Sequence, residues 1–115
     1  MPRTHCGDTC WSSYLPTPPS PEYPSAHAVI AGAAEAVLTH SVGPRVPVGF
    51  TATYRRGDGK VVNLDYPRGT PWEALTRDNV DARVWAGAHW RYSDEVGAVL
   101  GRQIGAYDLQ RLGER

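Results

Sequence analysis

Residues 24–38 have the sequence Pro-Ser-Ala-His-Ala-Val-Ile-Ala-Gly-Ala-Ala-Glu-Ala-Val-Leu, and this stretch predicts the first helix of a helical protein. Ser25 is a preferred N-cap residue, and Pro24 before it cannot lie inside a helix. Gly32 predicts close packing of a neighbouring element, since glycine in mid-helix costs about 1 kcal/mol relative to alanine. The helix should end at Gly43. Its apolar residues recur at three- and four-residue spacing, which predicts a core face made of Val29, Ile30, Ala33, Ala34, Val37 and Leu38.

The segments on either side of this helix differ from it in period. A proline-rich stretch over residues 15–24 predicts an extended approach to the helix. After the helix, residues 48–54 and 60–64 flank Arg55-Arg56-Gly57-Asp58-Gly59, which is a hairpin signature. We expect the cationic side chains Arg55, Arg56 and Lys60 to form a solvated turn rather than a contact with an anionic partner.

Two more helices are predicted after the hairpin. The second begins at Thr70-Pro71-Trp72-Glu73, with Thr70 as N-cap, and fades at Gly87. The third begins with Ser93 as its cap and acidic residues in its first turn. It carries the apolar residues Val96, Val99, Leu100, Ile104 and Tyr107, and its face of Gly97, Gly101 and Gly105 would let another backbone approach. The predicted fold class is mainly α, a partial helical bundle with a small β-hairpin excursion near 48–64.

Length and charge restrict the classes of function. A chain of 115 residues forms one domain at most. Twelve basic residues balance twelve acidic ones, which gives no general attraction to nucleic acid or to an anionic membrane. No stretch is apolar for long enough to span a bilayer, and the N-terminus lacks the apolar core of a signal peptide. We therefore expect a soluble protein, with cytoplasmic, periplasmic and secreted locations all open.

The first residues of the chain contain both of its cysteines. Cys6 and Cys10, with His5 and Asp8 nearby, give a weak zinc pattern because the usual four-ligand spacing is not present. We interpret residues 1–15 as a poorly ordered leader. A metal-binding module built on these residues is an alternative that stoichiometric zinc in the purified protein would support.

The start of the first helix has the chemistry of an oxyanion site. A helix N-terminus presents backbone N–H groups without intrahelical partners, at the positive end of the helix dipole. Ser25 adds a hydroxyl donor, and the Ala26 amide can point the same way. His27 in the first turn can deliver or remove a proton near neutral pH. The alternative is a plain serine cap followed by a surface histidine.

A second segment carries Arg83 and, six residues later, His89. Their side chains cannot share one face of a continuous helix. Gly87 allows the helix to end and the chain to turn, which could bring His89 beside the Arg83 guanidinium. Arginine suits bidentate contact with an oxyanion, and a neighbouring histidine can act as ligand or nucleophile. The alternative is a surface arginine and an exposed histidine near a cap.

The order of these features resembles the vanadium-dependent haloperoxidases and the related type-2 phosphatidic acid phosphatases. Pro24-Ser25-Ala26-His27 is similar to their second signature motif, and the segment from Arg83 to His89 to their third. The match covers residues 16–110, as a partial domain of this superfamily. The first motif, a lysine and an arginine on one upstream helix, is absent from this sequence.

The resemblance implies a role for each matching residue. Ser25 and the Ala26 amide would donate to bound vanadate or phosphate, and Arg83 would contact its oxygens. His27 would be the acid–base histidine, and His89 would bind vanadium in a haloperoxidase or attack phosphorus in a phosphatase. Ala26 replaces the usual glycine, and Ser20 stands at the position linked to halide behaviour. The aspartate that orients the motif histidine is replaced by Ser93, with Asp94 one place later, so either residue would be its second-shell partner.

The resulting prediction is the oxyanion-binding portion of a haloperoxidase-like protein, with vanadate as cofactor and peroxide and halide as substrates. It would oxidise halide if the missing lysine and arginine half completed it, from upstream sequence or from another chain. Alone, we expect weak oxyanion binding and little turnover. One alternative is a phosphomonoester phosphatase of the same superfamily. Another is a non-catalytic remnant or interaction module.

Overall fold

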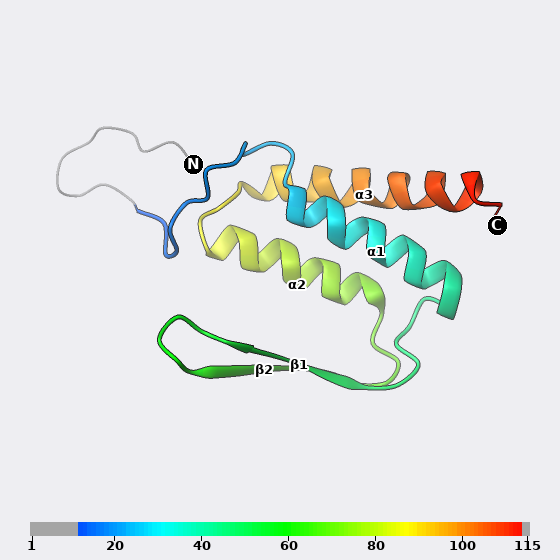
Figure 1. The fold of residues 1–115 in the computed structure, drawn as a ribbon, viewed down its shortest axis with the longest axis horizontal. Coiled ribbons are helices and arrows are strands. Elements are labelled where there is room, and N and C mark those ends of the chain that lie inside the picture. Colours follow the sequence, from blue (N-terminus) through cyan, green and yellow to red (C-terminus); the bar gives the residue numbers. More distant parts are fainter. Residues whose placement is uncertain (1–11, 114–115) are drawn as a thin grey trace.

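The computed structural model describes residues 12–113 and shows packed helices with one two-stranded sheet along one side of them (Figure 1). In chain order the elements are α1 (Ala26–Val42), β1 (Phe50–Arg55), β2 (Val61–Tyr66), α2 (Trp72–Trp85) and α3 (Arg91–Arg111). Helix α1 packs against both α2 and α3, and its axis runs beside α3 for most of its length. The predicted mainly α fold with a hairpin near 48–64 is confirmed.

Helix α1 begins and ends as its sequence predicts, but it does not bury the predicted face. Ser25 is the N-cap and its Oγ accepts a hydrogen bond from the Ala28 amide at 3.4 Å, while Gly43 ends the helix at a φ of 92°. The buried helix residues are Ala28 and Gly32. The prediction of a core built on the larger side chains was wrong, because Ile30 is 69% exposed. Val37 and Leu38 of the predicted face are exposed as well.

Small residues bury the contact between α1 and α3. A Cβ added to Gly101 would overlap the backbone oxygen of Val29, and one added to Gly32 would overlap that of Ala98. The two backbones therefore approach more closely than side chains would allow, which confirms the predicted role of the glycines. The larger apolar residues of α3 lie outside this contact, and Val99, Leu100, Ile104 and Tyr107 are exposed.

Helices α2 and α3 start at other residues than predicted. Pro71 rather than Thr70 is the N-cap of α2, and the Thr70 hydroxyl donates to the Pro67 carbonyl at 2.6 Å instead of capping the helix. Trp90 rather than Ser93 is the N-cap of α3. Neither cap makes a side-chain hydrogen bond, so backbone geometry from the preceding turn sets both starts.

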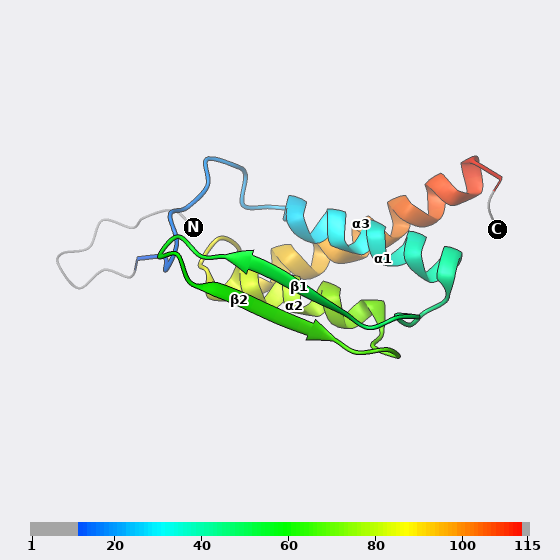
Figure 2. The ribbon, with the colours of Figure 1, turned by 60° about the horizontal axis from the view of Figure 1, so that its bottom comes forward.

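The hairpin has one apolar and one polar face. Phe50 pairs with Tyr66 on the apolar face, and the centroids of their rings lie 5.3 Å apart. On the polar face the Thr51 hydroxyl donates to Asp65 at 2.7 Å. The Tyr66 hydroxyl donates to Asp78 of α2 at 2.9 Å and connects the hairpin to the helices. Figure 2 shows both strands running beside α2.

The hairpin turn is solvated, with Arg55, Arg56 and Lys60 all exposed. None of the helices within residues 12–113 is long and apolar enough to cross a membrane. Cys6 and Cys10 lie outside the described residues. The leader predicted for residues 1–15 is described only from residue 12, and it stays a prediction.

Candidate functional site

The turn between α2 and α3 carries the histidine of the predicted site into the interior. Helix α2 ends at Trp85, and Gly87 follows at a φ of 75°, a conformation that glycine adopts without strain. The Ala88 amide donates to the Arg83 carbonyl at 3.1 Å and closes the turn. His89, which comes next, is 3% exposed. The sequence therefore buries this histidine by ending a helix at Trp85 and turning the chain at Gly87, two residues before it.

One nitrogen of the His89 ring is held by the approach segment. Its Nδ1 lies 2.7 Å from the Glu22 backbone oxygen and 3.7 Å from Glu22 Oε1. A carbonyl oxygen only accepts hydrogen bonds, so this contact selects the ring tautomer that carries hydrogen on Nδ1. The Nε2 atom is then the nitrogen with a free lone pair. That atom can act as a ligand or a nucleophile.

The Glu22 side chain is bound to the start of α3, directly after this turn. Its carboxylate accepts from the Trp90 amide and from the Ser93 hydroxyl, each at 2.8 Å. Burial raises the pKa of Glu22, but the hydrogen bonds from Ser93 and Trp90 outweigh it, and the net pKa is lowered. Glu22 is therefore ionised at neutral pH.

The N-termini of α1 and α3 meet beside His89. The Ser25 amide donates to the Ser93 carbonyl at 3.2 Å, and Ser25, Ser93 and Asp94 are all buried. Within residues 12–113 neither carboxylate oxygen of Asp94 has a hydrogen-bond partner. Burial raises the pKa of Asp94, against the opposing effects of the Ser25 hydroxyl and of His89 and Arg83. Its burial therefore makes this carboxyl group hold its proton more tightly than an exposed aspartate does.

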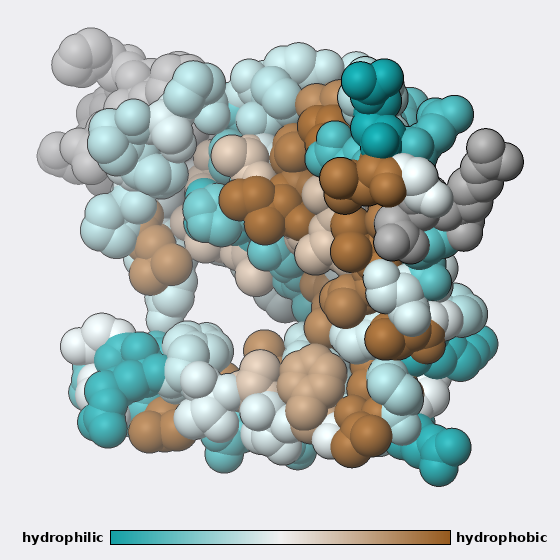
Figure 3. All heavy atoms as spheres, turned by 45° about the vertical axis from the view of Figure 1, so that its right-hand side comes forward, coloured by the Kyte–Doolittle hydropathy of each residue, from teal (hydrophilic) through white to brown (hydrophobic). Residues whose placement is uncertain are grey.

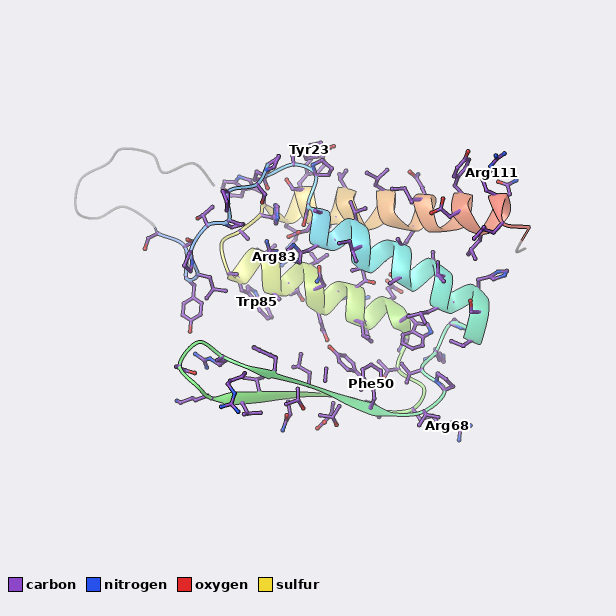
Figure 4. The ribbon with its side chains drawn as sticks, in the orientation of Figure 1. Tyr23, Phe50, Arg68, Arg83, Trp85 and Arg111 are labelled. Carbon is purple, nitrogen blue, oxygen red and sulfur yellow. The ribbon has the colours of Figure 1, made fainter. Side chains whose placement is uncertain are left out.

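Arg83 extends from α2 toward the same region. Figure 4 shows its side chain leaving α2 on the side of α1, whereas Trp85 points the other way, toward the hairpin. The Arg83 Nε is buried and has no hydrogen-bond acceptor among the described residues. A buried N–H donor without an acceptor is costly, and an oxyanion would supply one.

His27 lies near these groups but on the surface. The residue is exposed at the start of α1. Partial burial of its ring lowers the pKa of His27, electrostatic interactions with Arg83 and His89 lower it further, and Asp94 opposes them. These interactions indicate that His27 lies within electrostatic range of Arg83 and His89. A lowered pKa leaves His27 neutral and able to accept a proton at pH 7.

The structure thus brings the predicted residues into one region, at the place where α1 and α3 begin and α2 ends. It changes one expected contact, because the Glu22 carbonyl oxygen rather than Ser93 lies at hydrogen-bond distance from the His89 ring, and Ser93 donates to the Glu22 carboxylate. Glu22 was not among the predicted site residues. Its position just before Pro24-Ser25-Ala26-His27 was the signal, but nothing in the sequence tells which residue it would meet.

A known protein family matches most of the chain. The model of the VCPO second helical-bundle domain matches residues 3–114. The chain belongs to this family. Among solved structures, the VCPO-type domain is similar to the first bacterial vanadium-dependent iodoperoxidase, with a TM-score of 0.68 and 30% identity over 87% of this chain and 23% of the other.

A second solved structure is also similar to the chain. A holo-type bacterial vanadium-dependent chloroperoxidase matches with a TM-score of 0.66 and 28% identity over 84% of this chain and 22% of the other. No curated protein matches the chain. The VCPO-type domain therefore spans less than a quarter of the haloperoxidases that it resembles.

Proposed function

We propose that this chain provides the histidine-bearing part of a vanadate site in a vanadium-dependent haloperoxidase-like protein. The observation that supports it most strongly is the buried His89 ring, whose Nδ1 faces the Glu22 carbonyl at 2.7 Å. This contact leaves Nε2 as the atom that would bind vanadium. No conventional cation site competes with it, since the described residues contain no group of three or more His, Cys, Asp or Glu side chains that could hold a metal ion.

The other residues of the cluster fit an oxyanion. The Arg83 Nε is a buried donor without an acceptor within residues 12–113, and a guanidinium suits contact with charged oxygens. Ser25 and the Ala26 amide lie at the N-terminus of α1, where N–H groups and the helix dipole favour an anion. These groups would hold vanadate, or phosphate in its place.

His27 would handle protons at the edge of the site. It is exposed and has a lowered pKa, so it can take a proton from a substrate that arrives from solvent. When bound, vanadate would supply the Lewis acidity that activates peroxide for halide oxidation. The lysine and arginine of the first motif would have to come from sequence or chains beyond this one.

Calorimetric titration of the purified chain with vanadate tests this proposal. We expect saturable binding that phosphate displaces, that His89→Ala abolishes and that His40→Ala retains, because His40 lies at the other end of α1. Equal binding by the His89→Ala variant would overturn the assignment of His89. No binding by any form would favour the non-catalytic interpretation, and hydrolysis of a phosphomonoester by the same sample would favour the phosphatase.

A further inference from the structure

We propose that Glu22 is a positioning residue that fixes the His89 ring for its role at the oxyanion site. This inference rests on the proposed function, because it concerns the residue that would bind vanadium. It assigns to the approach segment a task that the sequence predicted for Ser93 or Asp94. The argument depends on the hydrogen bonds of Glu22.

The first step is that Glu22 contacts the ring with its backbone. Its carbonyl oxygen lies 2.7 Å from His89 Nδ1, which is a short distance for this kind of contact. The ring is 3% exposed, so a competing water-mediated arrangement has little room. A single acceptor therefore determines both the tautomer and the orientation of the ring.

The second step is that the side chain of Glu22 holds that carbonyl in place. Its carboxylate accepts from Trp90 N and Ser93 Oγ, each at 2.8 Å, at the start of α3 directly after His89. Residue 22 is thereby fixed to the turn that carries His89, although 67 residues separate them in sequence. Without the carboxylate, both donors lose their acceptor and the approach segment loses its attachment.

The third step is that the other nearby acid does not perform this task. Both oxygens of Asp94 lack a hydrogen-bond partner within residues 12–113, so they do not hold the ring. Ser93 acts on the ring only through Glu22. Among the described acids, Glu22 is therefore the one whose loss should disturb His89 directly.

The test compares Glu22→Ala and Glu22→Gln with the wild-type chain by two measurements. The ¹⁵N resonances of the neutral His89 ring report its tautomer, and His89→Ala assigns them among the four histidines of the sequence. Calorimetry reports the affinity for vanadate. Glu95→Ala is the matched control, because it removes an exposed carboxylate from the first turns of α3.

For the wild-type chain we expect one tautomer, with hydrogen on Nδ1. Glu22→Ala should give a mixture of tautomers and a vanadate affinity lower by roughly 10- to 100-fold, the usual effect of removing a partner that orients a ligand. Glu22→Gln keeps one acceptor oxygen. Its vanadate affinity and its ratio of His89 tautomers should lie between those of the wild type and of Glu22→Ala. Glu95→Ala should match the wild type in both measurements.

Each contrary result has a defined meaning. An unchanged tautomer in Glu22→Ala, with unchanged affinity, would overturn the positioning role. If that variant loses its helical circular dichroism, Glu22→Gln decides, and its identity with the wild type in both measurements would overturn the role. If no form binds vanadate, the proposed function fails, but the ring resonances still test whether Glu22 fixes His89.

Discussion

At the scale of single residues, Asp94 combines complete burial with unpartnered carboxylate oxygens among the described residues. Its raised pKa means that the folded state binds the proton more tightly than the unfolded state does. The stability of the fold is then greatest below the ordinary pKa of an aspartate. It decreases as the pH rises from that value through the raised one, where the carboxyl group ionises in the interior.

The variant Asp94→Asn should remove this penalty. We expect its free energy of unfolding at pH 7 to exceed that of the wild type, because the amide carries no charge to bury. The difference should shrink as the pH falls below the ordinary carboxyl range. Urea unfolding between pH 3 and pH 8 measures both effects, with the exposed Asp108→Asn as control. A variant that is less stable at every pH would contradict the expectation.

Sequence predicts some residues of the site and not others. The serine cap at Ser25, the turn at Gly87 and the pairing of Arg83 with His89 are local patterns. Each depends on residues that are close together in the chain. The role of Glu22 depends on a contact with a turn 67 residues away. A local sequence pattern does not encode a contact between residues so far apart in the chain. Sequence analysis therefore identified only Ser93 and Asp94, which lie close to His89 in sequence, as partners of its ring.

At the scale of elements, the close contact between α1 and α3 depends on glycines. Gly101→Ala would place a Cβ against the backbone oxygen of Val29, and backbone atoms cannot move aside as a flexible side chain would. We expect a loss of about 1–3 kcal/mol in the free energy of unfolding, as for other overpacked interiors. Chemical denaturation measures it. Gly57→Ala is the control, since a Cβ there meets no atom within 4 Å, and equal losses in both variants would refute the interpretation.

The elements also show where periodicity misleads. Spacing of apolar residues predicted three helices and a hairpin, and the structure has them. The same spacing predicted that large apolar residues form the core, yet Ala28 is buried and Ile30 is exposed. Periodicity identifies a face of large residues, but close helix packing selects small ones. The helices start at the caps Pro71 and Trp90 rather than at the predicted Thr70 and Ser93, and neither of these caps makes a side-chain hydrogen bond that a sequence pattern could have identified.

At the scale of the whole molecule, the fold is thin and carries much apolar surface. Its dimensions are 55 × 32 × 17 Å. Hydrophobic residues cover much of the face shown in Figure 3. The exposed large apolar residues of the molecule include Ile30, Val99 and Trp85. Since glycine and alanine make the contacts between helices, the larger side chains lie outside them. The helices and the hairpin are therefore held together by few large buried residues, and individual polar contacts between them matter more.

The hydrogen bond between Tyr66 and Asp78 is such a contact, because it joins the hairpin to α2. A two-stranded hairpin is only marginally stable by itself, and packing against a helix stabilises it. Tyr66→Phe keeps the ring beside Phe50 but removes the hydroxyl, so we expect faster hydrogen exchange at the amides of β1 and β2. A net hydrogen bond contributes about 0.5–1.5 kcal/mol, which corresponds to a several-fold rate increase. The amides of α1 and α3 should exchange as before. Tyr54→Phe, on the same face, should change nothing, and equal acceleration in both variants would show that the hydroxyl of Tyr66 does not hold the hairpin.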